Sequence, residues 1–325
     1  MNQTPAPVHS MRDRRHRAQA AGTSSEVTSV RTVLVTGATG GIGAATVEAL
    51  LRHGYHVWAV ARDDPGRLRL RQRFGEAVRV LAFDVTDSRA ISEAAEEVIA
   101  AGPLFGIVNN AGAALPGPLE LLPIEQFERQ IDINLTGQLR VTQAMLPALH
   151  SGVRAWGEAR IVVMGSFDAR LVGPLFGPYA ASKHGLVGLA DGLRSELYPA
   201  RIKVVLLEPG AVATPIWRRG TGVLAELQPR LPDGGGPYRS VMDFAQRHVS
   251  TLSRRGGSPD RVAQAVVDSL QARRPRPRRV VGVDAAVAAV LVQALPPSVI
   301  YRITALPAVW SAARWRRRVQ RSHSP

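Results

Sequence analysis

The chain has no cysteine, which excludes disulfides, thiolate metal sites and cysteine nucleophiles. With no cysteine and no His-rich pair, we expect no metal site. Because nothing in the chain requires an oxidising compartment, we expect a cytoplasmic protein. Long apolar runs are lacking too: residues 280–295 are interrupted by Asp284 and Gln293 and followed by Pro296 and Pro297. A spanning helix needs about 20 largely apolar residues, so none is predicted, and no secretory signal is recognisable.

Lysine is nearly absent as well, since the chain has only Lys183 and Lys203. Lys183 stands four residues after Tyr179 and seventeen after Ser166. Residues four apart share one face of a helix, so the phenol and the ammonium can act together. A nearby cation favours the phenolate, and we predict a lowered pKa for Tyr179 that suits proton exchange with an alcohol or carbonyl. Because this spacing also occurs by chance on surface helices, its meaning depends on the rest of the chain.

The net charge of +15 at first suggests a nucleic acid partner, but the charge is concentrated in three segments. Residues 1–31 contribute +3, and the arginines within 273–279 and within 314–321 contribute +5 each. The rest of the chain is therefore nearly neutral. We interpret the basic segments as solvated tails and expect no specific nucleic acid partner. Contact of the basic C-terminus with an anionic membrane is the alternative, which would make the protein membrane-associated.

Residues 1–30 are polar and rich in Arg and Ala, which predicts a disordered extension. From Thr32 onward, β-branched strands alternate with helices, the pattern of a doubly wound parallel sheet, or Rossmann fold. Strands are expected at 32–35, 55–60, 78–83, 105–108, 160–164, 203–207 and 280–283, and helices at 44–52, 88–101, 125–150, 178–198, 241–252 and 259–272.

These elements predict one α/β domain over residues 31–283. Within it, the Gly- and Pro-rich residues 210–257 are interpreted as a lid over the substrate. Residues 284–325 alternate apolar pieces with prolines and end in arginines. They are expected to form a C-terminal extension of short helices, packed on the domain or against a partner or membrane surface.

Residues 36–43 read Thr-Gly-Ala-Thr-Gly-Gly-Ile-Gly, between a predicted strand and a predicted helix. The glycines permit a tight turn and close approach of a ligand to the backbone. The helix N-terminus offers free N–H groups and a positive dipole to a pyrophosphate. In this context the motif predicts dinucleotide binding rather than a plain turn.

The second predicted strand leads to Arg62, followed by Asp63 and Asp64. At this place an acid binds the ribose 2′-hydroxyl of NAD, whereas an arginine accommodates the 2′-phosphate of NADP. Arg62 is the first of the three to emerge from the strand, which favours NADP(H) over NAD(H). Either aspartate would favour NAD(H) instead if it bent back to the ribose.

With these motifs the chain resembles the short-chain dehydrogenase/reductase family, in its compact one-domain branch. The match runs from about residue 31 to residue 272 and follows the family's motifs in order. They are the glycine loop, Asp84 with Val85, Asn109 to Gly112 (Asn-Asn-Ala-Gly), Asn134, Ser166, Tyr179 with Lys183, and Pro209-Gly210 with Thr214. The resemblance implies cofactor contacts from Thr36, Gly37, Thr39, Gly41, Ile42, Gly43, Arg62, Asp84, Val85, Asn110, Ala111, Gly112, Tyr179, Lys183, Pro209, Gly210, Val212 and Thr214.

The resemblance also implies a catalytic tetrad of Asn134, Ser166, Tyr179 and Lys183. Tyr179 is expected to act as the general acid in reduction and the base in oxidation. Ser166 is expected to orient the substrate oxygen. Lys183 is expected to lower the pKa of Tyr179 and to hold the nicotinamide ribose, and Asn134 to bind a water that links Lys183 to solvent.

The segments after the fifth and sixth predicted strands supply apolar side chains for a substrate pocket. Substrate contacts are expected from Ser166, Phe167, Phe176, Tyr179 and Trp217. Such a pocket suits an apolar alcohol or ketone, such as a steroid, retinoid or long-chain aliphatic. The residues around Tyr179 are similar to the steroid and retinol dehydrogenase branch, although kinship at this level does not fix a substrate. The family often pairs the helices predicted at 125–150 and 178–198 between subunits, so a homodimer or homotetramer is expected.

The sequence thus predicts an enzyme that transfers a hydride between NADP(H) and an apolar alcohol or ketone. The main alternative is a catalytically silent NADP-binding regulator, against which the intact tetrad argues. An epimerase or dehydratase of the family's longer branch is disfavoured by the glycine spacing and by the lack of a large C-terminal domain. A nucleic acid-binding role for the arginine-rich tails is the fourth alternative, and it predicts salt-dependent binding.

Overall fold

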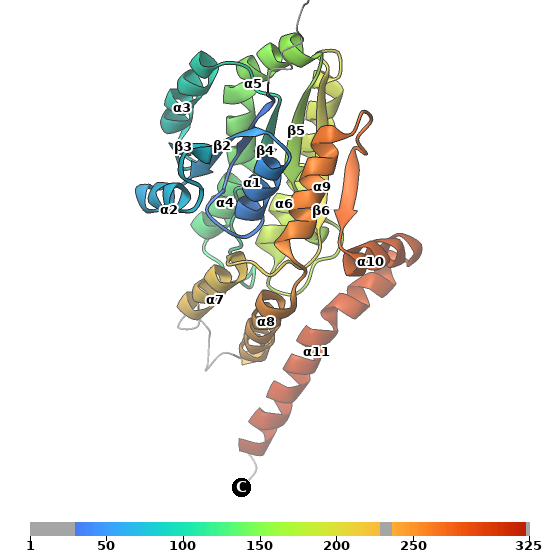
Figure 1. The fold of residues 1–325 in the computed structure, drawn as a ribbon. Helices are drawn as coiled ribbons and strands as arrows, with labels where there is room; N and C mark the ends of the chain where they lie inside the picture. Colours follow the sequence, from blue (N-terminus) through green and yellow to red (C-terminus); the bar gives the residue numbers. More distant parts are fainter. Residues whose placement is uncertain (1–29, 228–235, 323–325) are drawn as a thin grey trace, which may run out of the picture. The chain divides into compact units, whose positions relative to one another are not determined.

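A seven-stranded parallel sheet forms the centre of the protein in the computed structural model, which describes residues 30–227 and 236–322. The strands are β1 (Thr32–Val35), β2 (His56–Ala61), β3 (Val78–Ala82), β4 (Gly106–Asn109), β5 (Ala159–Met164), β6 (Ile202–Pro209) and β7 (Arg278–Val281). They lie in the order β3-β2-β1-β4-β5-β6-β7, and every neighbouring pair is parallel (Figure 1). The predicted doubly wound α/β fold is confirmed, whereas the N-terminal extension predicted to be disordered lies outside the described residues apart from Val30.

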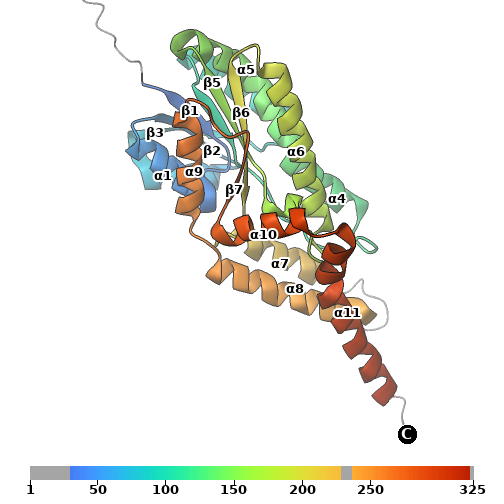
Figure 2. The same cartoon turned by 90° about the vertical axis from the view of Figure 1, so that its right-hand side faces the viewer.

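Helices cover both faces of this sheet, as Figures 1 and 2 show. They are α1 (Gly41–Arg52), α2 (Asp64–Phe74), α3 (Ser88–Ala101), α4 (Ile124–Ile131), α5 (Gly137–Trp156), α6 (Gly177–Leu197), α7 (Ile216–Leu227), α8 (Gly236–Arg255), α9 (Pro259–Gln271), α10 (Val283–Ala294) and α11 (Pro297–Ser322). Helices α1 and α9 pack on one face, and α3, α5 and α6 on the other.

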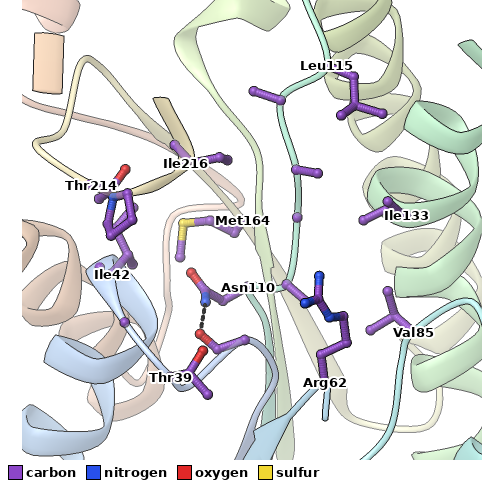
Figure 3. A pocket seen from close by; sticks show the side chains of 18 of the residues that line it. Thr39, Ile42, Arg62, Val85, Asn110, Leu115, Ile133, Met164, Thr214 and Ile216 are labelled. Atoms are coloured by element: carbon purple, nitrogen blue, oxygen red, sulfur yellow. Dashed lines mark hydrogen bonds between the residues drawn. The ribbon is translucent and has the colours of Figure 1, made fainter. Parts of the chain in front are cut away.

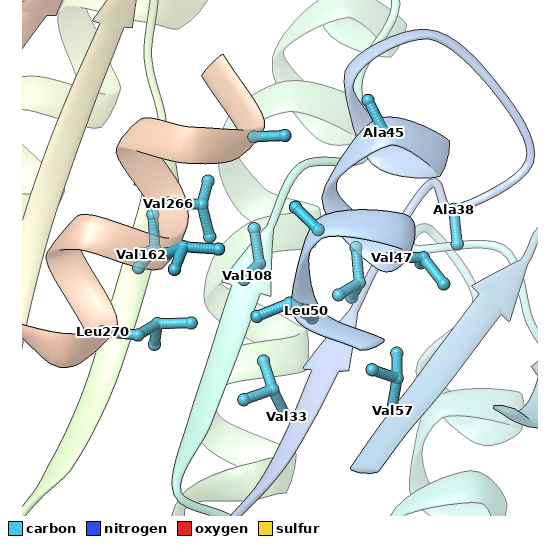
Figure 4. Packing of buried hydrophobic residues seen from close by; sticks show 14 of the residues in the cluster. Val33, Ala38, Ala45, Val47, Leu50, Val57, Val108, Val162, Val266 and Leu270 are labelled. Atoms are coloured by element: carbon cyan, nitrogen blue, oxygen red, sulfur yellow. The ribbon is translucent and has the colours of Figure 1, made fainter. Parts of the chain in front are cut away.

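The strand sequences explain why both faces are covered. Successive side chains of a strand point to opposite faces, and β-branched and aliphatic residues occupy both. Val33 and Val35 join the core beneath α1 and α9, whereas Leu34 between them joins the core beneath α3, α5 and α6. Figure 4 shows the first of these cores, with Leu50 of α1 and Val266 of α9 packed over the strands.

The long helix predicted at 125–150 is divided into three parts. Helix α4 ends at Ile131, a π-helical turn covers Asp132–Thr136, and α5 begins at Gly137. A π turn holds one residue more than an α turn. Hydrophobic periodicity does not reveal it, because the apolar pattern continues on both sides.

The C-terminal extension differs from the expected short helices. Helix α10 has 12 residues, but α11 has 26 and contains Pro307. Proline usually breaks a helix interior because it removes one hydrogen bond and clashes with the preceding turn, and that rule predicted an interruption here. Helix α11 packs against α8, which in turn packs against α7.

Candidate active site

The order of the strands creates a cavity at the carboxyl edge of the sheet. The chain leaves β1 toward β2 and β3 on one side and returns at β4 on the other, so the loops after β1 and β4 diverge, a geometry that commonly binds dinucleotides. The cavity there has a volume of about 1010 Å³. Figure 3 shows Thr39, Ile42 and Thr214 along one side of it, and Val85, Ile133 and Leu115 along the other.

The glycine loop after β1 can be built only from glycine at its critical positions. Gly37 and Gly41 have φ angles of +64° and +54°, which favour residues without a Cβ. A Cβ on Gly43 would lie 2.1 Å from the carbonyl oxygen of Gly37. No side chain of the described residues caps the N-terminus of α1, so its first N–H groups face the cavity as an anion site.

Sixteen of the eighteen residues predicted to contact the cofactor line this cavity, all except Thr36 and Gly43. These two belong to the loop but do not face the cavity. The hydroxyl oxygen of Thr36 accepts hydrogen bonds of 3.0 Å from the backbone N–H groups of Asn110 and Ala111. The side chain of Asn110 donates to the carbonyl oxygens of Thr36 at 2.9 Å and Gly37 at 3.2 Å. The loops after β1 and β4 therefore form one hydrogen-bonded unit.

Asp84 lines the cavity rather than capping a helix. Its carboxylate accepts hydrogen bonds from the backbone N–H and the hydroxyl of Thr86, at 2.9 and 2.8 Å. Asp87, three residues later, caps α3 instead. The carboxylate of Asp84 is thereby held at the place where β3 opens into the cavity.

Two arginines stand where β2 enters the cavity. Arg62 was predicted there, and Arg69 of α2 joins it. Asp63 caps α2 by accepting a hydrogen bond of 2.8 Å from the N–H of Gly66, and its carboxylate lies 3.0 Å from Arg62. These hydrogen bonds hold the pKa of Asp63 below its ordinary value, and the bond from Gly66 has the largest effect. Sequence reasoning missed Arg69 because α2 has few buried apolar side chains and shows no amphipathic pattern.

Tyr179 and Lys183 lie one turn apart on α6, and both are buried. The ammonium nitrogen of Lys183 is 5.5 Å from the centre of the Tyr179 ring and donates a hydrogen bond of 2.8 Å to the carbonyl oxygen of Met164. Ser166, just beyond β5, lines the cavity with both of them. Three members of the predicted tetrad therefore meet on one wall of the cavity.

The electrostatics of this wall differ from the sequence prediction. Burial raises the pKa of Tyr179 above its ordinary value, the carboxylate of Asp168 raises it further, and a hydrogen bond with Ser166 lowers it less. The prediction of a lowered pKa is therefore wrong for this arrangement, because desolvation of the phenolate is the largest effect on Tyr179. Burial also lowers the pKa of Lys183 to about 8, although Asp168 acts in the opposite direction.

Sequence reasoning missed Asp168, which bonds directly to a tetrad residue. The hydroxyl of Ser166 donates to its carboxylate at 2.9 Å, and its backbone N–H donates back to the Ser166 hydroxyl oxygen at 3.1 Å. The available signal was an acid two residues after a candidate catalytic serine.

Asn134 lies within the π turn and is fully buried. Its amide nitrogen donates to the carbonyl oxygen of Ala113 at 3.0 Å and to the hydroxyl of Ser182 at 2.9 Å, and its amide oxygen accepts from the N–H of Ala113 at 2.8 Å. Both amide N–H groups are engaged, so its side chain holds the loop after β4 against α6. It does not line the cavity.

The substrate side of the cavity differs from the prediction. Neither Phe167 nor Phe176 is among the lining residues, and Phe176 is buried against Ala114 and Tyr179. The side chain of Trp217 lies outside the part of the chain that the structure describes. Apolar lining comes from Ala114, Leu115, Ile216 and Val223, and polar lining from Glu128, Arg129 and Glu226. The position of Leu115 soon after Asn-Asn-Ala-Gly was an available signal for one of these residues.

Comparison with known proteins relates this chain to short-chain dehydrogenases. A family model described as short chain dehydrogenase matches residues 31–221. The chain is 31% identical over 260 residues to an NADPH-dependent 3-dehydrocapnine reductase of Ornithobacterium rhinotracheale, covering 78% of this chain and 88% of that protein. It is 32% identical over 262 residues to an 11-beta-hydroxysteroid dehydrogenase type 2 of Oryctolagus cuniculus, covering 76% and 63%. Among solved structures, an actinorhodin polyketide ketoreductase variant with NADPH has a TM-score of 0.63 and 28% identity, covering 77% of this chain and 95% of that one.

Proposed function

The chain belongs to the short-chain dehydrogenase family, and we propose that it is an NADP(H)-dependent oxidoreductase acting on an apolar alcohol or ketone. One observation carries the proposal: Ser166, Tyr179 and Lys183 line the same cavity as the glycine loop. The dinucleotide-binding loop and the residues that could transfer a proton thus line one cavity.

The residues present fit a dinucleotide with a 2′-phosphate. The glycine loop and the N-terminus of α1 would receive the pyrophosphate, and Arg62 and Arg69 would receive the 2′-phosphate, which arginine binds through charge-assisted hydrogen bonds. Asp63 is engaged with Gly66 and Arg62, which disfavours it as a ribose ligand for NAD(H). The 3-dehydrocapnine reductase and the ketoreductase, which are named with NADPH, support this choice.

The proton is handled by the chain's own residues, whereas the bound cofactor supplies the hydride chemistry. The raised pKa of Tyr179 keeps its phenol protonated at neutral pH, as a general acid for ketone reduction requires. The Ser166 hydroxyl, which donates to Asp168 in this structure, would turn to donate to the bound substrate oxygen instead and hold it beside the phenol. The ammonium of Lys183, 5.5 Å from the ring, would stabilise the phenolate that remains after proton transfer.

The apolar side chains of Leu115, Ile216 and Val223 support an apolar substrate, as does the similarity to a hydroxysteroid dehydrogenase. We propose that residues 210–257 form the lid of the cavity. Within their described part, α7 and α8 share a small apolar core with the loop before α6. It contains Leu175, Leu224, Leu227, Val241, Met242 and Ala245.

Cofactor preference is tested by titrating the protein with NADPH and with NADH and following its fluorescence. Wild type should bind NADPH more tightly, and Arg62→Asp should weaken NADPH binding roughly tenfold to hundredfold because a charge-assisted contact becomes repulsive. Arg67→Asp is the matched control, since Arg67 lies on the same helix as Arg69 but does not line the cavity. Equal or tighter binding of NADH by wild type would contradict the choice of NADP(H).

Catalysis is tested with NADPH and a panel of apolar ketones. Tyr179→Phe removes the acidic proton and should lower kcat about thousandfold while NADPH still binds. Unchanged turnover in this variant would refute the role of Tyr179. A wild-type protein that binds NADPH but turns over no ketone or alcohol would favour a silent regulator.

A further inference from the structure

Exposed apolar side chains are concentrated at the C-terminal end of the chain. Of the eighteen large hydrophobic residues that are exposed in the described part of the chain, eleven lie between Val283 and Trp310, on α10, α11 and their junction. Proteins rarely expose apolar residues in such a contiguous group unless something covers them. In Figure 2, α10 lies across the lower end of β7, and α11 extends past α8 away from the sheet.

The exposed residues follow the spacing of helical stripes. On α10 they are Val283, Val287, Val290 and Leu291, at positions i, i+4, i+7 and i+8, opposite the buried Ala285 and Ala289. On α11, Val299, Ile303, Leu306 and Trp310 lie at positions i, i+4, i+7 and i+11, whereas the exposed Tyr301 and Val309 lie off this line. Residues at these intervals share one face of a helix. Each helix therefore presents an apolar stripe, and the two stripes together are named the C-terminal apolar face.

The charge of this segment has one sign. The sequence has no Asp or Glu after Asp284, but it has six arginines: Arg302, Arg314, Arg316, Arg317, Arg318 and Arg321. The described side chains of Arg302 and Arg317 are exposed. The apolar face is thus accompanied by a purely positive charge that is densest near its end.

We propose that the C-terminal apolar face docks on an anionic lipid bilayer. In the described ranges 30–227 and 236–322, no helix has the length and apolar character to cross a bilayer, so α10 and α11 would lie in its plane. The valines and leucines would enter the acyl boundary while the arginines remain among anionic headgroups. Trp310, with 63% of its surface exposed, is a side chain that membrane interfaces favour.

Charge and apolarity together distinguish this partner from two others. A nucleic acid would pair with the arginines but would leave the apolar stripes in water. A second copy of the chain would cover the stripes, but the same segment of that copy offers no acid to the arginines. The anionic bilayer satisfies both features at once.

Docking would also bring the cavity close to the membrane. Helix α11 packs on α8 and α8 packs on α7, and Ile216 and Val223 of α7 line the cavity. The docking surface is therefore separated from the substrate side of the cavity by α8 and α7.

The test is cosedimentation of the full chain with vesicles of phosphatidylcholine alone and of equimolar phosphatidylcholine and phosphatidylglycerol. Wild type should bind the anionic vesicles, and added salt should weaken that binding. Replacing Arg314, Arg316, Arg317 and Arg318 with Gln should weaken it about fivefold for each arginine. The matched control replaces Arg12, Arg14, Arg15 and Arg17, which removes the same charge from the other end of the chain, and it should weaken binding much less.

The apolar contribution is tested in a second variant, in which Val287, Leu291, Ile303 and Trp310 become Ser. It should lose at least tenfold in vesicle affinity, whereas Ile99→Ser on the remote helix α3 should not. Failure of wild type to bind anionic vesicles, or an equal loss from both sets of Arg→Gln changes, would overturn the proposal. A dimer in analytical ultracentrifugation that the Ser variant abolishes, or nucleic acid binding that the Ser variant retains without vesicle binding, would overturn it as well. None of these readouts depends on NADPH or turnover, so the proposed function can fail independently.

Discussion

The hydroxyl of Ser166 donates a hydrogen bond of 2.9 Å to the carboxylate of Asp168. The serine that would orient the substrate oxygen is thus bonded to an anion within the same turn. The same carboxylate raises the pKa of Tyr179 and offsets part of the lowering that burial causes in Lys183. One side chain beside the tetrad therefore acts on three of its members.

Asp168→Asn should change the pH dependence of catalysis. Removing the negative charge lowers the pKa of Tyr179, so the phenolate needed as a base in alcohol oxidation forms at lower pH. The rise of the oxidation rate with pH should move down by about one unit. The measurement is kcat against pH with NADP⁺ and an alcohol substrate. Asp191→Asn, on the exposed side of α6, is the control, and an unchanged or upward-shifted profile for Asp168→Asn would contradict the assigned role.

Lys183 should make cofactor binding dependent on pH. Its lowered pKa of about 8 means that the ammonium loses its charge as the pH rises through that value. Affinity for NADPH should therefore fall with rising alkalinity, and NADH should show the same trend because both contain the nicotinamide ribose. Fluorescence titrations over neutral and alkaline pH measure this. Lys183→Met should bind more weakly at neutral pH and lack the dependence, and a dependence that survives in this variant would assign it to another group.

Adding a Cβ at two glycines should damage cofactor binding at one and stabilise the fold at the other. A Cβ on Gly43 meets the carbonyl oxygen of Gly37 at 2.1 Å, so Gly43→Ala must displace the loop and should weaken NADPH binding at least tenfold. Gly188 lies exposed on α6 with nothing within 4 Å of the added atom. Gly188→Ala should therefore raise the free energy of unfolding by about 1 kcal/mol. Thermal denaturation and NADPH titration of both variants test this contrast, which normal NADPH binding by Gly43→Ala would contradict.

Glu208 should be a determinant of stability in acid. It is fully buried and accepts hydrogen bonds of 2.7 Å from Arg170 and 2.5 Å from Arg278. Burial alone would raise the pKa of Glu208, but the hydrogen bonds from Arg278 and Arg170 outweigh it and lower that pKa. The resulting stabilisation is complete above the pKa of an unfolded glutamate, about 4.3, and is lost as the pH falls below it toward the folded-state pKa.

Glu208→Gln should reduce the free energy of unfolding near neutral pH by about 3 kcal/mol, because two arginines lose a buried partner. The difference from wild type should shrink in acid. Denaturant unfolding at neutral and acid pH measures both effects. Glu93→Gln, which breaks an exposed pair with Arg89, should have almost no effect. A Glu208→Gln variant as stable as wild type would contradict the role of this cluster.

The parts of the molecule that could be predicted from sequence are those fixed by short-range patterns. Apolar strands such as Thr32–Val35, the glycine loop that follows it, and the spacing of Tyr179 and Lys183 each depend on a few neighbouring residues. The direction of the Tyr179 pKa shift could not be predicted, because it depends on burial by distant parts of the chain. Phe176 is a second case: its apolar character suited a pocket, but packing against Ala114 turned it into the core.

The π turn at Asp132–Thr136 separates two tasks along what looks like one helix. Its extra residue advances the following helix by about 100° relative to an uninterrupted α-helix. Before and within the turn, Glu128, Arg129, Asp132 and Ile133 line the cavity, whereas after it Val141, Met145 and Leu149 fill the core beneath the sheet. The turn therefore lets the first half of the helix present one side to the cavity while the second half presents a different side to the core. Deleting one residue here would rejoin the two phases and force a choice between the cavity and the core.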